Sequence, residues 1–244
     1  MCKIILSFTQ KSFTLYSKYV EQFNGNIMFR KIGMVIVLFL VTGSVFGQGF
    51  KFGILFDPTI TWLRSDVKDV IPDQARLGFD FGLSADYYFA RNYAFATGIS
   101  LFNTGGTLLY VNGVLNFRTR NGNIEIASGD KIKYKVQYIR IPVAIKLKTH
   151  MIGRFIYSVN IGFDPMIRVS AGADFNKEKS IRVNDEINFL NMGWHFGGGA
   201  QYSLGGEVSL FGGISLMNTF ADMTRPMHDR ITSNNLTLRI GIMF

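Results

Sequence analysis

The stretch LTLRIGIMF, residues 236–244, alternates large apolar side chains with small or polar ones. One face of an extended chain would carry Leu236, Leu238, Ile240, Ile242 and Phe244, and the other Thr237, Arg239, Gly241 and Met243. Such strict alternation predicts a β-strand with one apolar face. That face must be covered either by a protein core or by lipid.

The same alternation recurs along most of the chain. It appears in seven further runs, which cover residues 50–62, 77–89, 93–101, 139–147, 155–169, 190–202 and 207–220. The pattern of the last of these runs is weaker. Strands of soluble β-sandwiches average about 5–6 residues, whereas a tilted strand that crosses a bilayer needs about 9–11. The length of these runs therefore favours strands that cross a membrane, with the Phe, Ile, Leu and Val face in lipid.

The connections between the runs alternate between short and long. The short ones are residues 90–92, 149–153 and 203–206, and the long polar ones are 63–75, 111–133, 173–188 and 221–231. This alternation places all long loops at one end. We therefore predict an all-β fold, an eight-stranded antiparallel transmembrane β-barrel with short periplasmic turns and long extracellular loops. Because a barrel has no open edge, its first and last strands must pair.

Three prolines, Pro58, Pro142 and Pro165, lie within the predicted strands. Proline has no N–H to donate to a strand ladder. These positions either weaken the strand assignment or mark bulges.

Composition excludes several other classes of protein. The chain has 244 residues, of which 48% are hydrophobic, with 26 Gly and 23 Phe, so disorder is excluded. No run of about 18 apolar residues follows Gln48, which excludes a helical membrane protein. The net charge of +9 is not gathered into a basic stripe with interleaved aromatics, so we expect no nucleic-acid partner.

The N-terminal segment has the order of a secretory signal peptide. Residues 28–47 carry Arg30 and Lys31 near their start, continue with a short apolar run, and end in small residues before Gln48. A membrane anchor or a buried helix is the alternative. We therefore expect residues 1–47 to form a leader, with translation starting at Met1, Met28 or Met34, and residues 48–244 to form a single barrel domain.

The leader also carries Cys2, the only cysteine of the chain. Removal of the leader would leave a mature chain without cysteine, and so without a disulfide framework or a zinc site.

Charged residues on the inward faces form the candidate site. Lys51, Asp86 and Arg239 are expected near the periplasmic end on neighbouring strands, and Arg140 and Asp164 face each other across the fourth and fifth strands. An eight-stranded lumen has room only for side chains, and buried charges must pair. We predict a structural charge network that closes the lumen without an open pore. The alternative is a small conduit or a proton-responsive plug.

Other chemistry has little support in the sequence. The histidines His150, His195 and His228 lack metal-ligand spacing. His195 is expected in the lumen beside Asn191 and Gln201, hydrogen-bonded there or, alternatively, paired with a serine as in outer-membrane lipid hydrolases. The glycine-rich segments 104–107 and 196–201 lack the lysine and the helix of a phosphate loop. We predict no catalytic, cofactor-binding or metal-binding residues and no enzymatic activity.

The sequence also resembles a known family. The segments that carry the resemblance are GFKFGI (49–54), YIRIPVAIKLK (138–148), NMGWHFGGGAQY (191–202) and the terminal LTLRIGIMF. They are similar to the small outer-membrane β-barrel proteins of Bacteroidetes, and most of all to those of the PorT type. The resemblance implies a place in the cell outer membrane and a non-enzymatic role in the type IX secretion system, in export of gingipain-type proteases and other cargo.

The resemblance also implies the partners. They are outer-membrane lipid, other secretion-system proteins, and the barrel-assembly machinery, because the final residue Phe244 is similar to the terminal signal which that machinery recognises. An outer-membrane enzyme and a structural or surface-binding barrel without a secretion role are the alternatives.

Overall fold

The structure is a computed structural model. It describes residues 49–66, 68–111, 115–119, 122–175, 178–184, 186–224 and 230–244. The predicted leader and its alternative start sites lie outside the described residues, as does His228.

Eight antiparallel strands form a closed ring in the described part of the chain. The strands, in chain order, are β1 (Phe50–Ser65), β3 (Arg76–Ala90), β4 (Tyr93–Tyr110), β7 (Lys131–Arg140) continued by β8 (Val143–Lys148), β9 (Phe155–Phe175), β11 (Leu190–Gly205), β12 (Val208–Thr219) and β13 (Ile231–Met243). Each strand pairs with its neighbour in this order, and β1 pairs with β13 to close the ring. The predicted eight-stranded barrel is confirmed.

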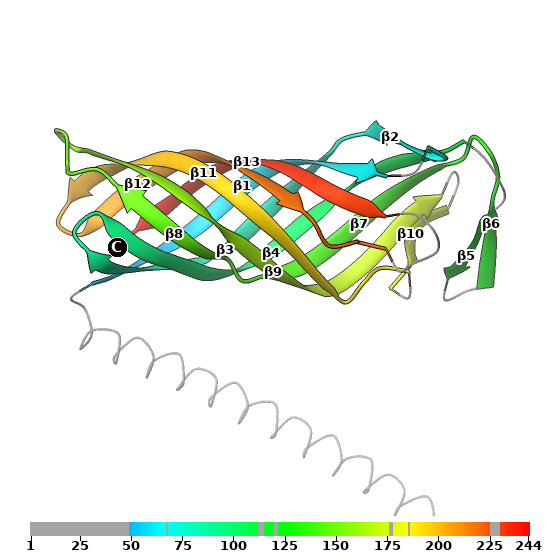
Figure 1. Cartoon of the computed structure of the whole chain (residues 1–244), viewed down its shortest axis with the longest axis horizontal. Coiled ribbons are helices and arrows are strands. Elements are labelled where there is room, and N and C mark those ends of the chain that lie inside the picture. Colours follow the sequence, from blue (N-terminus) through cyan, green and yellow to red (C-terminus); the bar gives the residue numbers. More distant parts are fainter. Residues whose placement is uncertain are drawn as a thin grey trace, which may run out of the picture. The chain divides into compact units, whose positions relative to one another are not determined.

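The two ends of the barrel differ in their connections (Figure 1). Short turns join β3 to β4, β8 to β9 and β11 to β12, and the chain ends beside them. We refer to this as the short-turn end. At the opposite, long-loop end lie four short strands, which are β2 (Val70–Gln74), β5 (Leu115–Thr119), β6 (Gly122–Ile126) and β10 (Glu178–Arg182). The predicted long connections are therefore partly strands.

Several barrel strands extend beyond their predicted ends. β4 continues past residue 101 to Tyr110, and β9 continues past residue 169 to Phe175. Alternation weakens there because the inward side chains become apolar and pack on one another inside the barrel. The resulting cluster includes Leu108, Ile132 and Tyr134, each 0% exposed.

Pro142 interrupts one strand without changing its register. The predicted strand over 139–147 is divided into β7 and β8, because Pro142 cannot donate to the ladder. Arg140 pairs with Met166 and Val143 with Phe163, so the register against β9 is the same on both sides of the proline. The register shift of β7 lies earlier, between Gln137 and Tyr138. The other two prolines lie inside β1 and β9.

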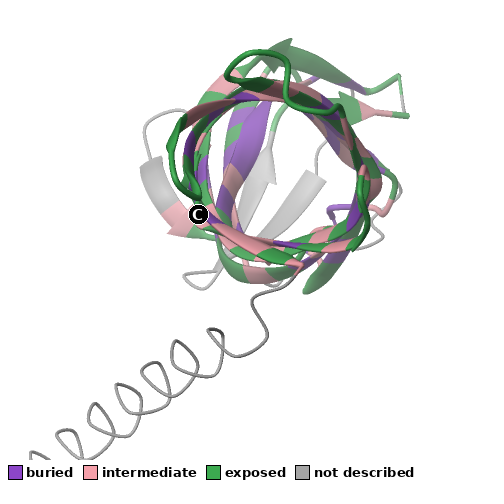
Figure 2. Cartoon of the chain, turned by 90° about the vertical axis from the view of Figure 1, so that its left-hand side faces the viewer, coloured by how far each residue is buried: buried purple, intermediate pink, exposed green. Residues whose placement is uncertain are grey.

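The inner face of the ring is largely buried and the outer face is exposed (Figure 2), and the exposed outer face is apolar. Outward side chains such as Phe56, Leu83 and Ile240 are 53%, 56% and 49% exposed. Among the described residues, no helix is long and apolar enough to cross a membrane. Aromatic pairs surround the short-turn end, and they are Phe50–Tyr87, Phe89–Phe95 and Phe155–Tyr202, with ring centroids 4.8, 4.7 and 5.1 Å apart.

Candidate functional site in the lumen

Arg140 lies at the centre of the lumen, where it meets carboxylates from two other strands. It is the last residue of β7, and its guanidinium forms an ion pair with Asp80 of β3. A second guanidinium nitrogen lies 3.9 Å from the carboxylate of Asp164 on β9. The other oxygen of Asp164 lies 2.8 Å from Nδ1 of His195 on β11. We refer to Asp80, Arg140, Asp164 and His195 as the central cluster.

Small neighbours on β3 and β4 make room for the long Arg140 side chain. Its register partner is Ser100, whose hydroxyl accepts a hydrogen bond from Arg140 Nε at 3.4 Å. Ser100 in turn pairs with Gly82. The guanidinium also lies 5.5 Å from the ring centroid of Phe102, within the range of a cation–π contact.

A second ion pair joins the two strands that close the ring. Arg239 Nε on β13 lies 3.3 Å from Asp57 Oδ2 on β1. The other carboxylate oxygen of Asp57 accepts a hydrogen bond from the backbone N–H of Ile240 at 3.0 Å. Pro58, the next residue, has no N–H for this ladder. The β1–β13 pairing is interrupted between Leu55 and Thr59, and there the Asp57 carboxylate gives the Ile240 N–H an acceptor.

A third pair lies nearer the short-turn end. Lys146 Nζ on β8 is 2.6 Å from Asp86 Oδ2 on β3. Between them lies β4, whose inward residues Ala94 and Ala96 are too small to separate the two groups. Lys51 is the backbone register partner of Asp86 across β1 and β3.

The structure thus arranges the predicted site residues differently from their expected grouping. Arg140 and Asp164 do approach each other, but Asp80 is the nearer partner of Arg140. Asp86 pairs with Lys146, and Arg239 with Asp57.

Sequence reasoning did not select Asp57, Asp80, Lys146 or His195 for the network. Alternation places each of them on an inward face, so the signal was present. Which inward charges meet depends on the order and tilt of the strands around the ring. The alternation of residues along one strand does not reveal this order or tilt.

A cavity of about 60 Å³ extends from the central cluster toward the short-turn end. Its lining includes Arg140, His195, Lys146 and Met243. A buried water needs about 10–15 Å³ of such space, so the cavity has room for about four waters. Apolar side chains border it on both sides. The large cluster that contains Phe102 and Tyr138 lies toward the long loops, and a small cluster of Leu55, Phe211 and Met243 lies toward the short turns.

The arrangement is suited to filling the lumen. Each buried carboxylate of the three pairs has a cationic partner, which offsets the cost of removing it from water. Within the described ranges, no group of three or more His, Cys, Asp or Glu side chains could hold a metal ion. His195 is 4% exposed and bonded to Asp164.

Comparison with known proteins identifies the family. Residues 43–225 match the family described as "Outer membrane protein beta-barrel domain". The chain belongs to this family. It is therefore an outer-membrane β-barrel, with its apolar outer face in lipid, its short turns toward the periplasm and its long loops outside the cell. Nothing in the family match is specific to barrels of the PorT type.

Solved structures of other small barrels are similar in fold. Neisserial surface protein A is 12% identical, with a TM-score of 0.45, over 79% of this chain and 95% of that one. OprG from Pseudomonas aeruginosa is 12% identical, with a TM-score of 0.45, over 80% and 96%. The outer membrane protease OmpT from Escherichia coli is 8% identical, with a TM-score of 0.39, over 80% and 96%. No protein of curated function matches the sequence.

Proposed function

We propose that this barrel is a non-enzymatic component of the type IX secretion system, needed for export of gingipain-type proteases and other cargo. The resemblance of its strands to PorT-type barrels supports the proposal. The observation that carries the mechanism is the filled lumen. With a cavity of about 60 Å³ between two apolar clusters, the barrel offers no path for a polypeptide. Its role is therefore exerted through contacts with other proteins.

The absence of catalysis is part of this proposal. A histidine–aspartate pair alone lacks the nucleophile that a hydrolase needs. Among the described residues, the hydrogen bond of His195 joins Nδ1 to Asp164, and His195 forms no hydrogen bond to a serine. Both residues sit between apolar clusters inside the barrel, away from the lipid and from the loop tips. We assign them to the structural charge network, together with Asp86, Arg140 and Arg239. Lys51, which was predicted to join this network, lies beside Asp86 but forms no ion pair within the described residues.

We also propose roles for the two ends of the chain. We propose that residues 28–47 direct export and are removed before Gln48, and that the last strand with Phe244 is recognised by the barrel-assembly machinery. Phe244 is 46% exposed on the outer face, and its backbone exchanges hydrogen bonds of 2.8 and 2.9 Å with Phe52. The terminal residue therefore takes part in closing the ring.

Deletion of the gene in the native host tests the secretion role. We expect extracellular protease activity to fall and uncleaved precursors to accumulate in the periplasm, as measured by activity assays and immunoblots of cell fractions. Expression of the wild-type chain from a plasmid should restore export. Normal export in the deletion strain would overturn the secretion role.

The second candidate is a structural or surface-binding barrel. The strands at the long-loop end favour it, because β2 and β10 extend the barrel wall outside the cell. A deletion strain that exports normally, but attaches less well to host or matrix material, would support this alternative.

A further inference from the structure

Lysines gather on the inner face at the periplasmic end of the barrel. Lys51 is the second residue of β1, and Lys146 and Lys148 lie at the end of β8. The charges that act on Lys148 include those of Lys51 and Lys146. The only carboxylate among these neighbours, Asp86, forms its ion pair with Lys146. Within the described residues, Lys51 and Lys148 form no ion pair, so this end carries an excess of positive charge.

The unpaired lysines face the lumen mouth and not the lipid. Their sequence neighbours Phe50 and Leu147 are exposed on the outer face, at 40% and 39%, and successive strand residues point to opposite faces. Lys148 Nζ lies 3.8 Å from the ring centroid of Tyr88, another inward residue. Asn92 Nδ2 donates a hydrogen bond to the Lys148 carbonyl at 2.7 Å, which fixes the end of the strand.

Tyr88 offers a hydrogen-bond donor at the same place. Its hydroxyl is buried and has no hydrogen-bond partner in the part of the chain that the structure describes. A buried polar group without a partner is costly. An anion held between Lys51 and Lys148 would give this hydroxyl an acceptor.

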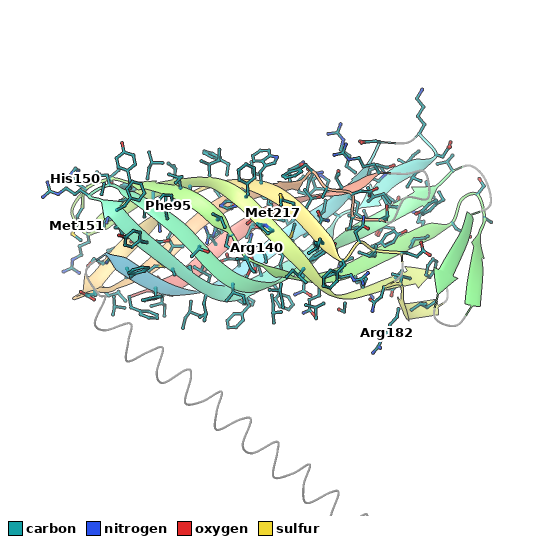
Figure 3. All side chains as sticks on the ribbon, turned by 60° about the horizontal axis from the view of Figure 1, so that its bottom comes forward. Phe95, Arg140, His150, Met151, Arg182 and Met217 are labelled. Carbon is teal, nitrogen blue, oxygen red and sulfur yellow. The ribbon has the colours of Figure 1, made fainter. Side chains whose placement is uncertain are left out.

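The periplasmic turns extend the positive charge and add apolar contact. Arg91 and Arg154 are exposed on two of the turns. Met151 and Ile152 are 56% and 61% exposed on the turn between β8 and β9. Figure 3 shows Met151 beside His150 at the tip of this end.

We propose that this cationic mouth, made of Lys51, Tyr88 and Lys148 with the turn arginines Arg91 and Arg154, binds an acidic peptide segment of a periplasmic protein. The inference rests on the proposed role of the barrel as a partner-dependent secretion component. Carboxylate side chains match the excess of ammonium and guanidinium groups. The exposed Met151 and Ile152 would pack against apolar residues of the same segment.

The position of the lysines favours a peptide over a lipid headgroup. Phospholipid phosphates lie outside the ring, at the level of the aromatic pairs that surround this end. Lys51 and Lys148 lie on the inner face, behind the backbone of the barrel wall. The Lys146–Asp86 pair and the apolar cluster of Leu55, Phe211 and Met243 lie close by. A segment would therefore be held at the mouth and would not pass through.

Binding of a labelled oligoglutamate peptide tests the proposal. The barrel would be reconstituted in phosphatidylcholine nanodiscs, and binding followed by fluorescence anisotropy, with an oligoglutamine peptide of equal length as control. We expect the glutamate peptide to bind about ten-fold more tightly or better, with an affinity that falls as salt is raised. The double variant Lys51→Gln/Lys148→Gln should lose this preference.

A matched control separates the mouth from general surface charge. Lys68→Gln/Lys133→Gln removes two exposed lysines at the long-loop end and should bind like the wild type. Heat-modified migration on gels would verify that each variant folds. Equal affinity for both peptides, or unchanged affinity in the Lys51→Gln/Lys148→Gln variant, would overturn the proposal. The proposal would also be overturned if the Lys51→Gln/Lys148→Gln variant lost binding to phosphatidylglycerol vesicles but still bound the glutamate peptide. That result would identify a lipid site.

Cell assays distinguish failure of this inference from failure of the secretion role. If deletion of the gene blocks export and Lys51→Gln/Lys148→Gln also does, the mouth is supported as the contact surface. If deletion blocks export but the double variant exports normally, the acidic-peptide contact is overturned while the secretion role stands. If deletion leaves export unchanged, the secretion role fails whatever the peptide result.

Discussion

Adjacent glycines on β12 occupy opposite environments. A Cβ added at Gly213 would lie 2.5 Å from the carbonyl oxygen of Gly198 and 2.9 Å from Cα of Gly199, whereas one added at Gly212 would meet nothing within 4 Å. Backbone atoms cannot move aside cheaply. Gly213 is therefore required by the close approach of β11 and β12, and Gly212 is not.

This difference gives a prediction for one added methyl group. Gly213→Ala should lower the free energy of unfolding by about 1–3 kcal/mol, as overpacking does. Gly212→Ala should change it by less than about 0.5 kcal/mol. Urea titrations in lipid vesicles, followed by tryptophan fluorescence, would measure both. Similar losses in the two variants would contradict the assigned inward and outward positions.

Arg140 supplies the positive charge that offsets the carboxylates of Asp80 and Asp164 in the central cluster. Replacement by methionine keeps much of the volume but leaves the buried carboxylates of Asp80 and Asp164 without their arginine. We expect Arg140→Met to cost about 3–5 kcal/mol of unfolding free energy, the usual result of breaking a buried pair on one side. The same urea titration would show it.

Neutralising the carboxylate as well should return part of this loss. In Arg140→Met/Asp80→Asn, the carboxylate charge that lost its nearest partner is gone. If the double variant were less stable than Arg140→Met, the Asp80 charge would not lower the unfolding free energy once the arginine is removed. That result would contradict the pairing of Asp80 with Arg140.

At the scale of the element, β13 shows how alternation assigns each residue to lipid or lumen. Ile240 is 49% exposed on the outer face and Arg239, its neighbour, points inward to Asp57. The strand begins at Ile231, five residues before the stretch with the clearest alternation. Its first part faces apolar and hydroxyl side chains inside the barrel, so the period of two is weaker there.

An arginine on the lipid face of this strand should be costly. Ile240→Arg is expected to lower the unfolding free energy by about 2–4 kcal/mol, because it places a charge near the bilayer midplane. Leu204→Arg, at the periplasmic end of β11, should cost about 0–1 kcal/mol, because its charge reaches water. Unfolding titrations of both variants in vesicles would measure this dependence on depth, and equal costs would contradict the placement of the membrane.

At the scale of the whole molecule, pairing of β1 with β13 closes the ring, and side chains fill much of its lumen. The apolar cluster toward the long loops, the ion pairs and the small periplasmic cluster follow one another inside the lumen. We therefore assign the proposed contacts with other proteins to the two ends. The strand extensions face the outside, and the cationic mouth faces the periplasm.

A filled lumen predicts the absence of a steady ionic current. In planar bilayers, the purified barrel should insert without forming a channel of constant conductance. A porin inserted under the same conditions serves as control. A reproducible open level with each insertion of the wild-type protein would contradict the packing of the lumen.

The sequence alone was sufficient for the fold class, because a period of two over runs long enough to cross a bilayer leaves few other architectures. The terminal stretch with Leu238 and Ile240 on one face and Arg239 on the other already implied lipid outside and charge inside. The alternating lengths of the connections implied the two different ends. These properties are local, so they can be read from neighbouring residues.

Only the tertiary structure decided which charges meet. Arg140 joins Asp80 across β4, Asp86 joins Lys146 across the same strand, and Arg239 joins Asp57 where the ring closes. Inside a narrow barrel a long side chain crosses one or more strands, so its partner depends on tilt, on register and on which intervening residues are small. The extension of β4 to Tyr110 and β9 to Phe175 was likewise decided by packing, because apolar side chains meet inside the barrel where the local pattern no longer distinguishes two faces.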